Sequence, residues 1–292
     1  MIDLPRRPPV PIPTVRPLPE YLATGDLKDK YEDMKAVFQV PWMGVVTMAY
    51  AHYPRFYDTL WAGARPLCAS HAFVTASVGL RQLVEHEVVR LSPPPLVPRL
   101  EEAGYAPREI DNIRAMVEVL SHGNFPYLIL ATITRYLLEG GEMSTVRDAP
   151  GFAVRHAPDA VVPFVLMEPH HADPSTRAVY EEVKATLKLP FVNTDYRALS
   201  RWPSYFAMAW RDLKDVAGGP AHEALAERIH GQALDLARTL PNPGGLTSTT
   251  IREAAADDAT LNEVLQMSRL FQWLLPGLVT NVAYLRHQLR QA

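Results

Sequence analysis

The sequence predicts an all-α fold made of two similar helical repeats, and three observations lead to this prediction. Apolar residues recur at the three- and four-residue spacing of helices, no segment alternates as a strand would, and one segment resembles a later one. The 292 residues, 48% of them hydrophobic, are enough to bury a sizeable core. The composition is that of an ordinary globular protein.

The internal similarity is visible without gaps. Residues 31–61 align with residues 180–210, and eight of the 31 pairs are identical. About two identities would be expected by chance at average residue usage. A weaker similarity places the apolar segment around Pro126 over the one around Pro276. The pairs that fix the register are Pro41 with Pro190, Pro54 with Pro203, and Trp61 with Trp210.

These similarities divide the chain into four regions. Residues 1–24 form an arm with seven prolines among its first twenty positions, and residues 25–140 form the first repeat. Residues 141–175, rich in Pro, His and Asp, show no regular period and are interpreted as a long linker loop. Residues 176–292 form the second repeat. We expect the two repeats to make one compact unit.

Several local patterns predict where helices lie. Helical spacing of apolar residues is clearest in 80–91, 110–120 and 225–240. Thr250 followed by Glu253 is typical of a capping box at a helix start. Proline is tolerated in the first turn of a helix and not in its interior, so helices are expected to begin near prolines 41, 54, 190 and 203.

Charge and composition narrow the class of function. The net charge of −3 gives no reason to expect nucleic acid or an anionic membrane as partner, so a small molecule is expected. The single cysteine, Cys68, excludes a disulfide framework and a CxxC redox pair, which fits a reducing compartment. With no signal peptide and no apolar run of membrane-spanning length, we expect a soluble cytoplasmic protein.

Common cofactor and metal motifs are missing from the sequence. There is no GxSxG, no phosphate-binding glycine loop and no dinucleotide fingerprint, so no cofactor is expected. The linker residues Glu168, His170, His171 and Asp173 resemble metal ligands by type. Adjacent ligands in a loop rarely converge on one ion, so they are interpreted as solvated linker and no metal site is predicted.

The informative segment is the polar triplet Asn193, Thr194 and Asp195. The alignment of the repeats places it opposite residues 44–46, whose sequence is Gly-Val-Val. Asparagine or aspartate near a helix start is often only a cap. Asp195, however, matches the core-type Val46, so its side chain is expected to face inward. A carboxylate directed at the interior needs a proton or a partner, which makes Asp195 a candidate catalytic residue.

Asn124 is the second polar residue in an apolar setting. It precedes a strongly hydrophobic segment, and the matching position in the second repeat is Leu274. Its alternative interpretation is a turn or cap residue between a glycine and a proline. Trp42 and Trp202 are more typical of a core, although a tryptophan beside a polar site can form the wall of a small pocket.

With these residues in place, the chain resembles the group I D,L-2-haloacid dehalogenases. The resemblance rests on YEDMKAVFQVPW at 31–42, LEEAGY with EIDNI at 100–113, GNxxYL at 123–128, and TDYRALSRWP at 194–203. It covers most of the chain. Each motif is moderately specific, and their order and spacing strengthen the resemblance.

The resemblance implies a pseudo-dimer of two repeats threaded into a deep Stevedore-type knot, and a homodimer of two chains. It also implies the reaction, in which water attacks the α-carbon of a 2-haloacid and the 2-hydroxyacid forms with inverted configuration and no covalent intermediate or cofactor. The matching residues are Asp195 as the base, Asn124 as the group that holds the water, Trp42 as part of a dry wall, and Thr194 as a ligand of the substrate carboxylate.

The chain departs from the family pattern at three positions. Val45 and Thr194 stand where members carry phenylalanine and serine, and Phe271 lies near a position where some carry tyrosine. These changes are expected to widen and dry one side of the substrate pocket, so Val45 and Phe271 join the predicted substrate-binding residues. The alternative hypothesis is a non-catalytic protein that binds small carboxylates on the same scaffold. A disulfide reductase is excluded by the single cysteine.

Overall fold

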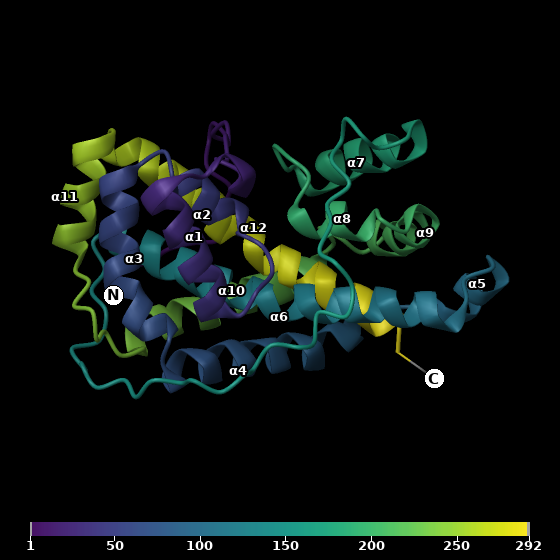
Figure 1. Cartoon of the computed structure of the whole chain (residues 1–292), viewed down its shortest axis with the longest axis horizontal. Helices are drawn as coiled ribbons and strands as arrows, with labels where there is room; N and C mark the ends of the chain where they lie inside the picture. The colour runs from purple at the N-terminus through teal and green to yellow at the C-terminus, as the bar shows by residue number, and fades with distance from the viewer. Residues whose placement is uncertain (1, 291–292) are drawn as a thin grey trace. The chain divides into compact units, whose positions relative to one another are not determined.

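Every regular element within residues 2–290 is a helix. A computed structural model describes residues 2–290, and within this range no residue belongs to a strand (Figure 1). Extended pairing is limited to one isolated bridge between Ser70 and Gly151. The predicted all-α class is confirmed. No helix within residues 2–290 is long and apolar enough to cross a membrane.

The chain order of the helices follows the two regions of similarity. The helices before residue 141 are the 3₁₀ helix η1 (Glu20–Leu22), α1 (Gly25–Phe38), α2 (Val45–Tyr50), α3 (Pro54–Cys68), α4 (His71–Glu87), the 3₁₀ helix η2 (Val88–Leu91), α5 (Val97–Glu102) and α6 (Pro107–Leu138). Those after it are α7 (Pro174–Leu187), α8 (Thr194–Leu199), α9 (Pro203–Lys214), α10 (Pro220–Thr239), α11 (Ser248–Asp258) and α12 (Leu261–Gln288).

The helices belong to two compact units. The first unit contains residues 1–80, 123–156 and 227–276, and the second contains residues 81–122, 157–226 and 277–292. The boundary therefore falls inside the four long helices α4, α6, α10 and α12. Each unit draws on both sequence repeats, so the predicted repeat boundaries describe similarity of sequence and remain a prediction.

Each unit has its own apolar interior. In the first unit, α3 packs along α11, and the two helices lie side by side in Figure 1. The side of α3 that carries Phe56, Leu60 and Ala64 is fully buried because apolar residues recur there every three or four positions. In the second unit, α9 packs against α7 and α8. Its buried stripe of Phe206, Trp210 and Leu213 follows the same periodicity.

The two aligned segments have the same local structure. α7, α8 and α9 begin at the positions that correspond to the starts of α1, α2 and α3 in the alignment of Tyr31 with Tyr180. The residue after α1, Gln39, and the residue after α7, Lys188, both adopt the left-handed conformation, with φ of 53° and 56°. The corresponding prolines Pro54 and Pro203 both stand first in their helices, as predicted.

The framework hydrogen bonds also correspond. Tyr31 Oη donates to the Leu18 carbonyl at 2.9 Å, and Tyr180 Oη donates to the Met167 carbonyl at 2.7 Å. The indole N–H of Trp61 donates to Asp33, and that of Trp210 donates to Glu182, both at 2.8 Å. Thus a small set of matched side chains gives both segments the same geometry.

Three local predictions were wrong. Pro41 and Pro190 lie in the turns after α1 and α7, several residues before the next helix starts. The left-handed residue that ends each helix is followed by a turn, and this turn occupies the residues between the proline and the start of α2 or α8. The capping box at the start of α11 uses Thr247 and Thr250, with mutual side-chain to backbone hydrogen bonds, so this helix starts earlier than Thr250 and Glu253 indicated.

Asn124 is also placed differently from its turn interpretation. It lies inside α6, which continues through Gly123 and Pro126. Proline removes a helical hydrogen bond, but Pro126 is held within a segment in which every residue from 119 to 138 is buried. Burial of the whole segment keeps it helical even though Gly123 and Pro126 favour a turn. The segment 139–173, between α6 and α7, contains no helix.

The N-terminal arm is attached to the first unit by its backbone carbonyls. Arg135 Nη1 donates to the Pro5 carbonyl at 3.2 Å, and the His230 imidazole hydrogen-bonds to the Leu4 carbonyl at 2.5 Å. The Leu4 side chain is buried. Because proline-rich chain keeps its carbonyls free of internal hydrogen bonds, it can supply acceptors to such buried cationic and polar groups.

Candidate active site

The six predicted site residues are divided between the two units. Trp42, Val45, Asn124 and Phe271 belong to the first, and Thr194 and Asp195 belong to the second. All except Val45 are buried, and Val45 is half-buried at the first position of α2. Each unit therefore buries most of its own predicted site residues.

Trp42 is held by the glycine and tyrosine of the GNxxYL motif. Its backbone carbonyl accepts a hydrogen bond of 2.7 Å from Tyr127 Oη, and the two rings lie 6.4 Å apart between centroids. A β-carbon on Gly123 would lie 2.8 Å from Cζ2 of the Trp42 indole. The motif therefore lets the indole pack directly against α6.

Asn124 lies in the same turn of α6, between the two residues that hold Trp42. Residues 123 and 127 share one face of the helix at the four-residue spacing, so Asn124 projects from an adjoining direction. It is 4% exposed. The first unit thus brings Trp42 and the helical turn of Asn124 together. Phe271 is placed in α12, where its side chain is buried.

In the second unit, Asp195 occupies the second position of α8. It is 1% exposed, so the inward orientation predicted for its side chain is what the structure has. Asn193 is the N-cap residue of this helix, yet its side chain makes no capping hydrogen bond. Its Oδ1 is buried and accepts no hydrogen bond within the described part of the chain. An orphaned buried acceptor beside a buried carboxylate favours a site for a polar molecule.

Charged and polar neighbours surround α8. Arg197 Nη1 lies 2.7 and 2.9 Å from the two carboxylate oxygens of Glu168, and its Nη2 lies 3.4 Å from the hydroxyl of Thr194. Burial and the negative charge of Asp195 raise the pKa of Tyr196, while its hydrogen bond with Asn281 lowers it. The phenol of Tyr196 therefore stays protonated beside Asp195.

The linker residues that resemble metal ligands have other partners. Glu168 forms the ion pair with Arg197, and Asp173 caps α7 by accepting hydrogen bonds from the backbone of Ser175 and Thr176. The hydroxyl of Ser175, together with the backbone and hydroxyl of Thr176, holds the pKa of Asp173 well below its usual range by hydrogen bonding to the carboxylate. Across residues 2–290, no group of three or more histidine, cysteine, aspartate or glutamate side chains is arranged to hold a metal ion.

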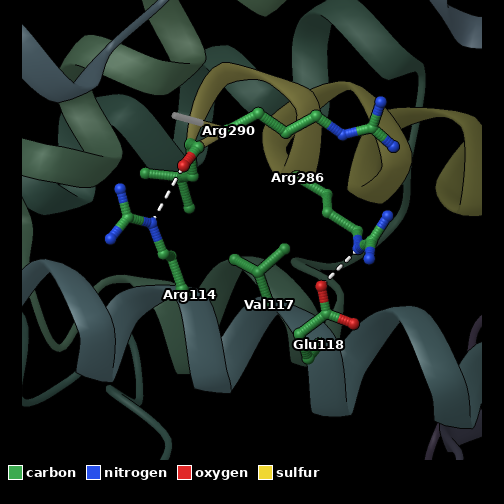
Figure 2. Close-up of a pocket in the computed structure, with 6 residues that line it drawn as sticks. Arg114, Val117, Glu118, Arg286 and Arg290 are labelled. Carbon is green, nitrogen blue, oxygen red and sulfur yellow. Dashed lines mark hydrogen bonds and ion pairs between the residues drawn. The ribbon is translucent and has the colours of Figure 1, made fainter. Parts of the chain in front are cut away.

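The second unit also has a cavity of about 430 Å³ that contains none of the predicted residues (Figure 2). In Figure 2, Arg114, Val117 and Glu118 project from α6, Arg286 projects from α12, and Arg290 lies just after the end of α12. Arg286 pairs with Glu118 and, at 2.8 Å, with Glu85, and Arg290 also pairs with Glu85 at 3.2 Å. Acidic side chains thus already neutralise part of the positive charge of these arginines.

Sequence reasoning missed three buried polar side chains of the second unit. Asn281, His222 and Tyr196 are not among the residues that the sequence singles out. The structure links these three residues by hydrogen bonds of 2.7 and 2.9 Å. The available signal was the asparagine itself, since an amide side chain among the mostly apolar residues 278–285 needs a partner.

Comparison with known proteins identifies close relatives. No family model matches the chain. It is 50% identical over 247 residues to an (R)-2-haloacid dehalogenase of Rhizobium sp. (strain NHG3), which covers 84% of this chain and 96% of the relative. It is 38% identical to an (R)-2-haloacid dehalogenase of Pseudomonas putida, over 98% of this chain and 96% of the relative.

Two more comparisons extend the similarity. A configuration-inverting 2-haloacid dehalogenase of Pseudomonas sp. (strain 113) is 27% identical over 77% of this chain and 75% of that protein. A crystal structure described as a D-2-halacid dehalogenase mutant superimposes with a TM-score of 0.88 at 34% identity, covering 99% of this chain and all of the other. By sequence and by fold, the protein is an enzyme that belongs to the 2-haloacid dehalogenase family.

Proposed function

We propose that the protein hydrolyses 2-haloalkanoic acids of the (R) configuration to 2-hydroxyalkanoic acids of inverted configuration. The observation that carries the proposal is the buried Asp195, which stands in a polar triplet where the matching segment has Gly-Val-Val. The names of the two relatives with the higher identities support the (R) hand, and the name of the third supports inversion.

In the proposed reaction, Asp195 accepts a proton from a water molecule as the water oxygen bonds to the α-carbon. The carbon–halogen bond breaks with its electron pair, halide departs, and the proton passes from Asp195 to solvent. A single displacement from the side opposite the halogen inverts the carbon. Asn124 orients the water, because an amide can accept from it while the carboxylate takes the other proton.

The remaining predicted residues shape the pocket. Trp42, Val45 and Phe271 exclude water from the departing halide, and the hydroxyl of Thr194 binds the substrate carboxylate. The guanidinium of Arg197 beside this hydroxyl adds positive charge to that end of the pocket. The orphaned Oδ1 of Asn193 needs a donor, which bound water would supply.

For the architecture, we propose that the two repeats form a pseudo-dimer joined by residues 141–175, knotted as in the related family, and that two chains form a homodimer. The matched helices, left-handed residues and framework hydrogen bonds of segments 31–61 and 180–210 support the duplication. Sedimentation equilibrium tests the dimer, and a monomer at micromolar concentration would contradict it.

The experiment for the reaction is a single turnover with excess enzyme in heavy-oxygen water. Direct attack by water labels every molecule of the 2-hydroxyacid, whereas attack by the carboxylate of Asp195 leaves the first product unlabelled. Substrates are the 2-chloro and 2-bromo acids of each hand. Halide release from the (R) acids with (S) product is expected, and an unlabelled first product would rule out the proposed mechanism.

A further inference from the structure

A directional chain of hydrogen bonds runs through the interior of the second unit and ends beside Asp195. The backbone N–H of Gly218 donates to His222 Nδ1 at 3.3 Å, and His222 Nε2 lies 2.7 Å from Asn281 Oδ1. Asn281 Nδ2 donates to Tyr196 Oη at 2.9 Å. The three side chains are no more than 2% exposed.

The direction of the chain follows from its first member. Because Nδ1 of His222 accepts a backbone proton, the imidazole proton lies on Nε2 and is donated to the amide oxygen of Asn281. The amide nitrogen is then the group that faces Tyr196. Each link fixes the orientation of the next, so the position of the Tyr196 phenol is determined by two buried side chains and a backbone amide.

Tyr196 follows Asp195 directly in α8, a helix of only six residues. So short a helix has little rigidity of its own, and its orientation depends on its attachments. One more side-chain attachment acts on it, the ion pair of Arg197 with Glu168. The hydroxyl of Ser200 donates to the Tyr196 carbonyl at 2.7 Å within the same turn.

The matching helix α2 shows that these attachments are not needed to form the helix. The positions of Tyr196, Arg197 and Ser200 are occupied there by Thr47, Met48 and Ala51. The hydroxyl of Thr47 donates within its own turn, to the Gly44 carbonyl at 2.9 Å. Helix α2 nevertheless has the same length as α8. Helix α2 is attached at its last residue, where Tyr50 Oη donates to Ser268 Oγ at 3.1 Å, whereas the attached phenol of α8 belongs to the residue next to the buried carboxylate.

We propose that Tyr196, Asn281 and His222 are positioning residues that fix the carboxylate of Asp195 for catalysis. This inference rests on the proposed role of Asp195 as the base. A base must hold its geometry to a fraction of an ångström, and a displacement of about 1 Å can lower the rate by roughly 100-fold. Anchoring the neighbouring phenol to two buried side chains and a backbone amide supplies that restraint.

The first test compares two buried tyrosines of the second unit. Tyr196→Phe removes the hydroxyl at the end of the chain, whereas Tyr205→Phe removes a buried hydroxyl that has no hydrogen-bond partner within the described part of the chain. We expect Tyr196→Phe to lower kcat roughly 10- to 100-fold with KM changed less than about threefold. Tyr205→Phe should leave both constants unchanged. Equal effects of the two substitutions would overturn the proposal.

The second test asks whether the chain acts as a unit. His222→Phe removes the donor to Asn281, whereas His222→Gln retains a donor near the position of Nε2. His222→Phe should lower kcat about as much as Tyr196→Phe, and His222→Gln should restore part of it. The double variant Tyr196→Phe with His222→Phe should be little worse than either single variant. Independent, multiplicative losses would contradict a connected chain.

A third measurement separates this inference from the proposed function. In protein labelled with ¹³C at aspartate side chains, the Asp195 signal is assigned by its loss in Asp195→Asn. It should shift in Tyr196→Phe and stay in place in Tyr205→Phe, whether or not the wild type releases halide. An unmoved signal refutes the positioning role. Absence of halide release from wild-type enzyme would instead refute the proposed function.

Discussion

Segments 31–61 and 180–210 share a framework and differ at the positions where chemistry is expected. Both contain a helix ended by a left-handed residue, a six-residue helix, and a helix begun by proline, with an indole bonded to an acidic side chain. At the start of the six-residue helix, residues 44–46 of one segment (Gly-Val-Val) correspond in the alignment to residues 193–195 of the other (Asn-Thr-Asp).

The packing explains why the polar triplet can occur in only one of the two segments as they stand. A β-carbon on Gly44 would lie 2.7 Å from the ring of Tyr127, so any side chain there collides with α6. Asn193 occupies the matching position, and its side chain is buried there. The same arrangement of three helices therefore accepts either an apolar or a polar start of its six-residue helix. The residues packed against that start determine which of the two fits.

The largest expected effect is that of Asp195→Asn. The amide nearly conserves volume but cannot take a proton, so halide release should fall by roughly 1,000-fold or more. The matched control is Val46→Thr at the corresponding position, which should keep most of the activity and cost only stability. Steady-state halide assays with circular dichroism measure both. Turnover above a few per cent in Asp195→Asn would show that another group is the base.

Asn124→Ala should have the next largest effect, lowering kcat about 100- to 1,000-fold if the amide orients the water. Its control is Leu274→Met, at the matching position of α12, which conserves volume and should cost less than about 1.5 kcal/mol of stability with little change in rate. A rise in KM alone would make Asn124 a substrate-binding residue.

Gly123→Ala tests the close approach of Trp42 to α6. The added methyl group would displace the indole, so we expect a loss of about 1 to 3 kcal/mol in the free energy of unfolding and a lower kcat. Gly231→Ala in α10 is the control, because a β-carbon there meets no atom within 4 Å. That substitution should stabilise the protein by about 0.5 to 1 kcal/mol. If Gly123→Ala and Gly231→Ala were equally stable, Trp42 would not pack against α6 as proposed for the wall of the pocket.

The smallest effects should come from Asp33 and Glu182, the acidic residues that accept the indole hydrogen bonds of Trp61 and Trp210. A hydrogen bond from Arg65 lowers the pKa of Asp33, and one from Lys214 lowers the pKa of Glu182. Because both folded-state pKa values are lowered, their stabilisation is present above about pH 4 and is lost as the pH falls through the folded-state values.

Asp33 is bound by two nitrogens of Arg65 and Glu182 by one of Lys214, with both carboxylates partly exposed. Asp33→Asn should therefore cost about 1 kcal/mol at pH 7 and Glu182→Gln about 0.5 kcal/mol, with both differences shrinking near pH 3. Urea unfolding at the two pH values measures them. Costs that do not change with pH would show that charge contributes nothing to the stabilisation by either acidic residue.

The sequence alone predicted the helical class, two helix starts and the buried carboxylate. Periodicity alone determined the helical class, and the alignment of Tyr31 with Tyr180 located the helix starts at Pro54 and Pro203. The contrast between Val46 and Asp195 singled out the buried carboxylate. These patterns are local or occur twice in the chain, so they can be recognised without knowledge of the packing.

Tertiary structure decided the rest. Helix α6 continues through Pro126 because its surroundings bury the whole segment, and the compact units combine parts of both repeats through contacts that no local pattern encodes. The chain from His222 through Asn281 to Tyr196 joins residues that lie far apart in sequence. A hydrogen bond between distant residues depends on how helices pack, and only the folded chain brings its donor and acceptor within reach.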